Sequence, residues 1–171
     1  MLNSRNVFIL VLIVLAAGLR LSGVLPYNFT PVAAIALFGA AMFSNRALGF
    51  LVPLVIMFVS DIFIGFHSSM IAVYAALVGV VLIGQWVRTN PTMLKAITGA
   101  FAGSILFFLV TNAAAWLVLP QYTKDISGLL NSYTAGLPFF RGTLAGDLLF
   151  TTVFFGSYKL AGYRFPTLVK A

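Results

Sequence analysis

The chain has no cysteine and very little negative charge. Its 171 residues include three aspartates, no glutamate and one histidine, against ten lysines and arginines. Without cysteine, disulfides, thiolate catalysis and cysteine-held metals or cofactors are excluded. One histidine leaves too few nitrogen ligands for a typical metal site. We therefore expect neither a metal nor a cofactor.

Apolar side chains are what the chain has in abundance. Hydrophobic residues make up 61% of it, charged residues 8%, and 17 residues are phenylalanine. The mean hydropathy is +1.08, which a soluble domain of this size does not show. The basic residues are scattered singly and form no run suited to nucleic acid. With no internal repeat or linker, residues 1–171 are predicted to form a single transmembrane domain in the lipid bilayer.

Apolar stretches between turn signals predict an all-α integral membrane protein with six transmembrane helices. The predicted spans are 6–22, 31–44, 47–64, 69–88, 94–119 and 143–160. The span 31–44 is short, so it must tilt, thin the bilayer locally or pack inside the bundle. The first span can also be read as a secretory signal, although it is long for one.

The basic residues favour one orientation of these spans. With both termini in the cytoplasm, seven basic residues lie on the inner side and three on the outer side. The inner seven are Arg5, Arg46, Arg88, Lys95, Lys159, Arg164 and Lys170, and the outer three are Arg20, Lys124 and Arg141. This split agrees with the positive-inside rule.

The connection over 120–142 is longer than the usual link between helices. Ile126, Leu129, Leu130 and Tyr133 recur there at helical spacing, which predicts a short interfacial helix. The segment is either a plain amphipathic connector on the membrane or a lid over an outward-facing site, and the sequence supports both equally.

Polar residues gather at the predicted outer end of the bundle. An ionised carboxylate in hydrocarbon is costly unless it is paired or wetted, so Asp61 and Asp147 are functional candidates. One interpretation is that they form structural ion pairs with Arg20 and Arg141. The interpretation we favour adds a small-molecule pocket with some of these pairs as walls. Its predicted lining is Asn28, Asp61, His67, Tyr74, Asn112, Trp116, Arg141 and Asp147.

Further features bear on partners and chemistry. Ala36 and Ala40 give span 31–44 a face of small residues for close approach, either within the bundle or to a partner subunit. No GxxxxGK[ST] phosphate loop occurs and no soluble segment is long enough for a nucleotide-binding domain, so we expect that the chain cannot itself couple ATP hydrolysis to transport. Gly146 and Asp147 do not complete a GxGD protease motif, because Leu144 stands where glycine belongs. We expect no enzymatic activity.

Three strings resemble a known group of proteins. They are Asn28 to Gly39 (NFTPVAAIALFG), Ser60 to His67 (SDIFIGFH) and Pro138 to Asp147 (PFFRGTLAGD). They are similar to an uncharacterised bacterial family of six-span proteins that is grouped with the substrate-binding S components of energy-coupling-factor (ECF) transporters. The solitary cobalamin-binding type of S component is the most similar in character.

The resemblance implies an S-component-like bundle in the bacterial inner membrane that captures a vitamin on its extracytoplasmic side. It implies cobalamin or a precursor as ligand, and an ECF coupling subunit with two ATPases as possible partners. By the matching motifs, Asp61, Tyr74 and Arg141 would be pocket residues. Two other classes stay open: a small ion-coupled transporter, and a structural or assembly subunit of a membrane complex.

Overall fold

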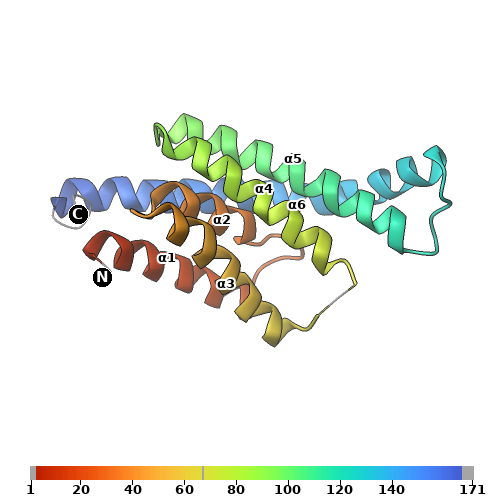
Figure 1. Cartoon of the computed structure of the whole chain (residues 1–171), viewed down its shortest axis with the longest axis horizontal. Helices are drawn as coiled ribbons and strands as arrows, with labels where there is room; N and C mark the ends of the chain where they lie inside the picture. The colour runs from red at the N-terminus through yellow and green to blue at the C-terminus, as the bar shows by residue number, and fades with distance from the viewer. Residues whose placement is uncertain (1–2, 67, 167–171) are drawn as a thin grey trace.

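A computed structural model describes residues 3–66 and 68–166. These residues form six helices and no strand, which confirms the all-α prediction. The helices are α1 (Ser4–Leu21), α2 (Val32–Met42), α3 (Arg46–Ile64), α4 (Met70–Arg88), α5 (Met93–Val118) and α6 (Ile126–Arg164). They run back and forth along one long axis, so that α1 begins and α6 ends at the same end of the bundle (Figure 1).

Four of the described helices are long and apolar enough to cross a membrane: α1, α3, α4 and α5. They are the helices of a membrane-embedded protein.

Helix α2 is different, because its 11 residues span about 16 Å at roughly 1.5 Å per residue, against a hydrocarbon core of about 30 Å. The prediction counted 31–44 as a crossing, whereas the structure has a half-length helix there, preceded by the non-helical segment 22–31.

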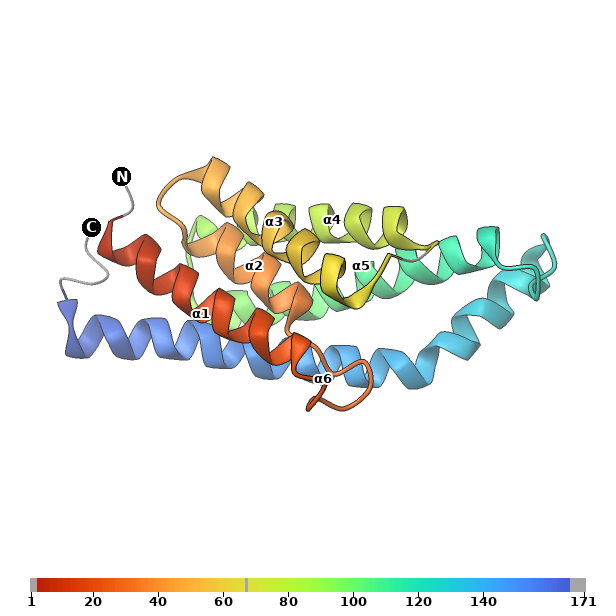
Figure 2. The same ribbon diagram turned by 90° about the horizontal axis from the view of Figure 1, so that it is seen from below.

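Helix α2 forms the centre of the fold. All eleven of its residues are buried, and it packs against each of the other five helices. Figure 2 shows it enclosed between α1, α3 and α6. A helix that is apolar on every side is stable in such a position, because no face needs water or headgroups. Of the ways in which a short span can be accommodated, packing inside the bundle is therefore the one observed.

The small residues of α2 are used within the chain. Ala36 and Ala40 are 1% and 0% exposed, and Gly84 of α4 lies so close that a Cβ there would come within 2.6 Å of the Ala40 side chain. Of the two roles that the sequence left open for these alanines, close approach within the bundle is the one observed, because the neighbouring helices cover the face that a partner subunit would need.

Basic side chains hold the C-terminal end of α2. The Arg5 Nε donates to the Met42 carbonyl at 3.0 Å, and the Arg88 guanidinium donates to the carbonyls of Phe43 at 2.7 Å and Ser44 at 2.6 Å. The last carbonyls of a helix lack partners inside it and carry partial negative charge. Cations from α1 and α4 satisfy them here.

Helix α6 corrects the prediction for 120–142. The structure has a short turn and then one continuous helix of 39 residues through Pro138, instead of a separate interfacial helix in a loop. The helical spacing over 126–133 is confirmed. The Asp125 carboxylate caps this helix by accepting from the Gly128 backbone N–H at 2.8 Å, a bond that also lowers the pKa of Asp125.

The first part of α6 lies along α5 and does not cover the bundle. Ser132 donates to the Asn112 carbonyl and Tyr133 to the Leu109 carbonyl, both at 3.1 Å. Figure 2 shows this part turned away from the line of the second part, as expected where proline removes a helical N–H. A separate lid helix is therefore not observed, although Gly136, Phe139 and Phe140 of this segment line one of the cavities described below.

Replacing Gly84 by alanine should destabilise the protein, because the new methyl group would overlap Ala40 and the Leu37 carbonyl. Overpacking of this kind costs roughly 1–3 kcal/mol, and thermal unfolding in detergent measures it. Gly156→Ala is the matched control, since a Cβ there meets nothing within 4 Å and alanine favours a helix. Equal unfolding temperatures for the two variants would contradict the packing described.

Candidate functional site

Asp61 forms an ion pair inside the bundle. Its carboxylate accepts from the Arg20 guanidinium of α1 at 2.8 Å and from the Tyr74 hydroxyl of α4, also at 2.8 Å. Arg20 donates in addition to the hydroxyl of Ser60, while the side chain of Asp61 is only 4% exposed. The cluster therefore links α1, α3 and α4 and neutralises both charges.

Asp147 has a different environment. It is 1% exposed and accepts from the Ser104 hydroxyl of α5 at 2.7 Å. The backbone amides of Ala33 and Ala34, in the first turn of α2, interact with the same carboxylate. Pro31 at the N-cap of α2 provides no side-chain hydrogen bond. Asp147 therefore acts as the missing cap of α2 from a helix more than a hundred residues away in sequence.

The predicted ion pair between Asp147 and Arg141 does not form. Arg141 is exposed, and neither a hydrogen bond nor an ion pair joins it to another described residue. The two residues lie six apart on α6, a separation that does not bring side chains together on one helical face. Of the two predicted pairs, only the one between Asp61 and Arg20 exists in the described part of the chain.

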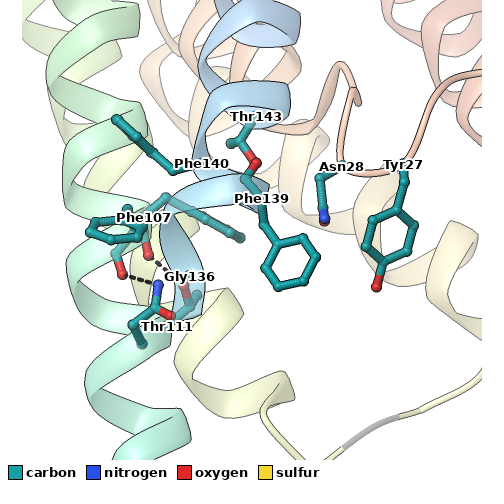
Figure 3. A pocket seen from close by; sticks show the side chains of 10 residues that line it. Tyr27, Asn28, Phe107, Thr111, Gly136, Phe139, Phe140 and Thr143 are labelled. Atoms are coloured by element: carbon teal, nitrogen blue, oxygen red, sulfur yellow. Dashed lines mark hydrogen bonds between the residues drawn. The ribbon is translucent and has the colours of Figure 1, made fainter. Parts of the chain in front are cut away.

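Two adjoining cavities lie between the non-helical segment 22–31 and the helices. The larger has a volume of about 300 Å³ and the smaller about 240 Å³. They share a wall of Asn28, Phe107, Thr111 and Thr143. Arg20, Thr30 and Asp147 contribute polar groups to the larger one. Half of the residues that line the smaller one, drawn in Figure 3, are aromatic: Tyr27, Phe107, Phe108, Phe139 and Phe140.

The shared wall offers hydrogen-bond acceptors. Thr111 donates its hydroxyl proton to the Phe107 carbonyl at 2.8 Å and Thr143 donates to the Phe139 carbonyl at 3.3 Å. Each hydroxyl therefore has only lone pairs left for a ligand. The Asn28 side chain makes no hydrogen bond with the described residues, so its amide can both donate and accept.

Asn28 is also held in an unusual backbone conformation. Its φ of +57° is in the left-handed region, which asparagine tolerates better than most residues. The Phe29 N–H donates to the Pro26 carbonyl at 2.9 Å, so Asn28 occupies the third position of a tight turn. This turn places Asn28 in the lining of both cavities.

The structure brings together only part of the predicted site. Asn28 and Asp147 line the larger cavity and Asn112 the smaller one, while Asp61 and Tyr74 stand behind Arg20. Arg141 and Trp116 line neither cavity, and the Trp116 indole donates to the Thr123 carbonyl in the turn before α6. His67 lies outside the described residues.

Several lining residues escaped the sequence reasoning. Arg20 was expected only as an ion-pair partner, and Thr30, Phe107 and Thr143 were not singled out as lining residues. Thr30 and Thr143 belong to the strings NFTPVAAIALFG and PFFRGTLAGD, which is a signal that could have found them. Phe107 is one of many phenylalanines and carries no such signal.

Comparison with known proteins gives a family. A family model matches residues 1–168. The chain belongs to the DUF6580 family. This is a family of unknown function, and no curated protein and no solved structure matches the chain. For this DUF6580 protein, the relation to S components therefore stays a prediction, and its site is interpreted from geometry.

Asp147→Ala should destabilise this DUF6580 protein, because the Ser104 hydroxyl and the first turn of α2 would lose their acceptor. Leaving a buried donor unpaired costs about 1–3 kcal/mol. Asp147→Asn keeps one acceptor oxygen and should lose less. Thermal unfolding of the three proteins tests this, and an unchanged unfolding temperature for Asp147→Ala would contradict the capping role.

Arg20 and Asp61 should behave as a coupled pair. Arg20→Met leaves the buried Asp61 carboxylate without its partner, at a cost of roughly 3–5 kcal/mol. Asp61→Asn leaves the partly exposed Arg20 unpaired and should cost less. The double variant should then lose less stability than the sum of the two single variants. A double-mutant cycle on unfolding free energies measures the coupling, and additive effects would mean that the pair is not formed.

Proposed function

We propose that this protein is a membrane-embedded binding subunit for the uptake of a small polar molecule, such as a vitamin or a vitamin precursor. The observation that carries the proposal is the polar cavity of about 300 Å³ between helices that are otherwise apolar. Placing Arg20, Asn28 and Asp147 around one interior space is costly in a membrane protein, and such residues typically serve a ligand.

The size of the cavities favours a small ligand. Drug-sized pockets run from about 300 to 1,000 Å³; the larger cavity, of about 300 Å³, is at the lower limit of that range and the smaller one, of about 240 Å³, is below it. A molecule of one or two rings suits them. Cobalamin, the ligand implied by the resemblance, is several times larger than either cavity, so we favour a smaller vitamin or precursor.

The lining also favours a particular ligand chemistry. Arg20 is paired with Asp61, and the Asp147 carboxyl group is held by Ser104 and the start of α2, so the cavity does not require a strongly charged ligand. The hydroxyls of Thr111 and Thr143 offer lone pairs, while Phe107 offers a flat apolar surface. We propose a flat ligand that presents N–H or O–H donors to this wall.

The proposed direction of capture follows from charge. Helix α1 lines the larger cavity with Arg20, near its C-terminal end. This end of α1 is opposite the end of the bundle where most basic residues lie (Figure 1). By the positive-inside rule, the cavity then belongs to the extracytoplasmic half. Because the chain has no phosphate loop of its own, active release to the cytoplasm would draw on a partner, such as an ECF coupling subunit with its ATPases, or on an ion gradient.

A thermal-shift screen against vitamins and their precursors tests the proposal, because a ligand that binds only the folded protein raises its unfolding temperature. Thr111→Val should lose about fivefold in affinity for a hit, since one hydrogen bond contributes roughly 1 kcal/mol. Thr152→Val is the matched control: this exposed threonine also donates to the carbonyl four residues earlier, at 2.8 Å, but does not line the cavities.

The outcomes separate the candidate functions. A hit that weakens in Thr111→Val and not in Thr152→Val supports the binding subunit. A hit unaffected by Thr111→Val would place the ligand elsewhere. A blank across the panel, with stability unaltered by Na⁺ or by pH, would favour a structural subunit, while a shift with Na⁺ or pH alone would favour an ion-coupled transporter.

A further inference from the structure

One end of the bundle concentrates positive charge. Arg5, Arg46, Arg88, Lys95, Lys159 and Arg164 all lie near helix ends there, at the left in Figure 1. None of the three acidic residues of the chain lies near them, because Asp61 pairs with Arg20, Asp147 faces the start of α2 and Asp125 caps the far end of α6. This end therefore attracts anions from outside the protein.

A groove of about 430 Å³ opens at this end. It lies between the end of α2, the turn from α4 to α5, and the last third of α6. Met42, Met93 and Phe155 give it apolar walls, whereas Thr92, Tyr158 and Lys159 contribute polar groups. The groove is thus amphipathic, with room for an apolar chain beside a polar head.

Lys159 lines the groove and is available to bind an anion, whereas other basic residues at this end are already engaged. Arg5 and Arg88 are engaged by the carbonyls at the end of α2, and Lys95 donates to Thr89 and lies 4.5 Å from the centre of the Trp86 ring. Lys159 is exposed and makes no hydrogen bond or ion pair with another described residue. The first turn of the 26-residue helix α5 borders the same groove and adds partial positive charge.

We propose that this groove is a specific site for an anionic diacyl phospholipid. The lipid phosphate lies against Lys159 and the start of α5, and one acyl chain lies against Met42, Met93 and Phe155. A basic pocket between helices at the membrane surface is suited to anionic headgroups, and the apolar walls give a lipid an advantage that a free phosphate lacks. The site is independent of the ligand cavity, which belongs to the other part of the bundle.

The test uses the full chain in a neutral detergent, with phosphatidylglycerol, phosphatidylcholine or inorganic phosphate added. Phosphatidylglycerol should raise the unfolding temperature by several degrees and remain bound in native mass spectrometry, whereas phosphatidylcholine and phosphate should do neither. Lys159→Gln should remove most of the phosphatidylglycerol effect. Circular dichroism of the variant without lipid verifies that it is folded.

Two control variants make the result specific to the groove. Lys124→Gln removes a basic residue from the opposite end, and Arg164→Gln removes an exposed one from the same end that does not line this groove. Both should keep the phosphatidylglycerol effect. An equal loss in Arg164→Gln would mean diffuse attraction to the basic end, an equal effect of phosphatidylcholine would mean apolar binding alone, and a shift with inorganic phosphate would mean a phosphate site. Each of these would overturn the proposal.

Discussion

The burial of α2 is the constraint on which the rest of the structure depends. A helix of eleven residues is too short to cross the bilayer, so its first turn lies within the protein, where neither water nor headgroups can satisfy the terminal amides, while its last carbonyls lie beside the exposed Ser44. Other helices must supply the partners. Asp147 does so at the positive end, and Arg5 and Arg88 do so at the negative end, so each charge complements the helix dipole.

The ligand cavity is a consequence of the same short helix. Because α2 begins partway along the bundle, the non-helical segment 22–31 must descend to meet it, and irregular backbone at that depth is tolerated only within protein or beside a polar cavity. The tight turn at Asn28 and the close approach of α6 at Gly146, where a Cβ would come within 3.0 Å of the Thr30 nitrogen, fit this segment to the helices. Asp147 is thus both a support of the fold and a wall of the cavity.

The sequence allowed much of this arrangement to be predicted, for physical reasons. The lengths of the apolar stretches locate the long apolar helices. Because the chain has only three acidic residues, Asp61 is one of few possible partners for Arg20, and this pair could be predicted. Helical spacing after Asp125 correctly predicts helix. These features are local, or follow from charge balance, so a single chain displays them.

The parts that could not be predicted depend on relations between distant segments. The first turn of α2 and Asp147 carry no shared pattern that shows they meet. Pro138 has the appearance of a boundary, yet packing against α5 continues the helix through it. Ala36 and Ala40 have the same spacing whether they face a partner or the inside of the bundle, and only the position of Gly84 decides between the two.

The use of acidic residues explains why the two ends of the bundle differ. The chain has three carboxylates, and each has a partner within the described residues: a guanidinium for Asp61, the start of α2 for Asp147 and the start of α6 for Asp125. Of the ten basic residues, only Arg20 therefore has a carboxylate partner among the described residues. Backbone carbonyls accept hydrogen bonds from some of these cations at the end of α2, but Lys159 has no such acceptor in the described part of the chain. The surrounding membrane, whose anionic lipids carry the complementary charge, is then the natural source of its partner.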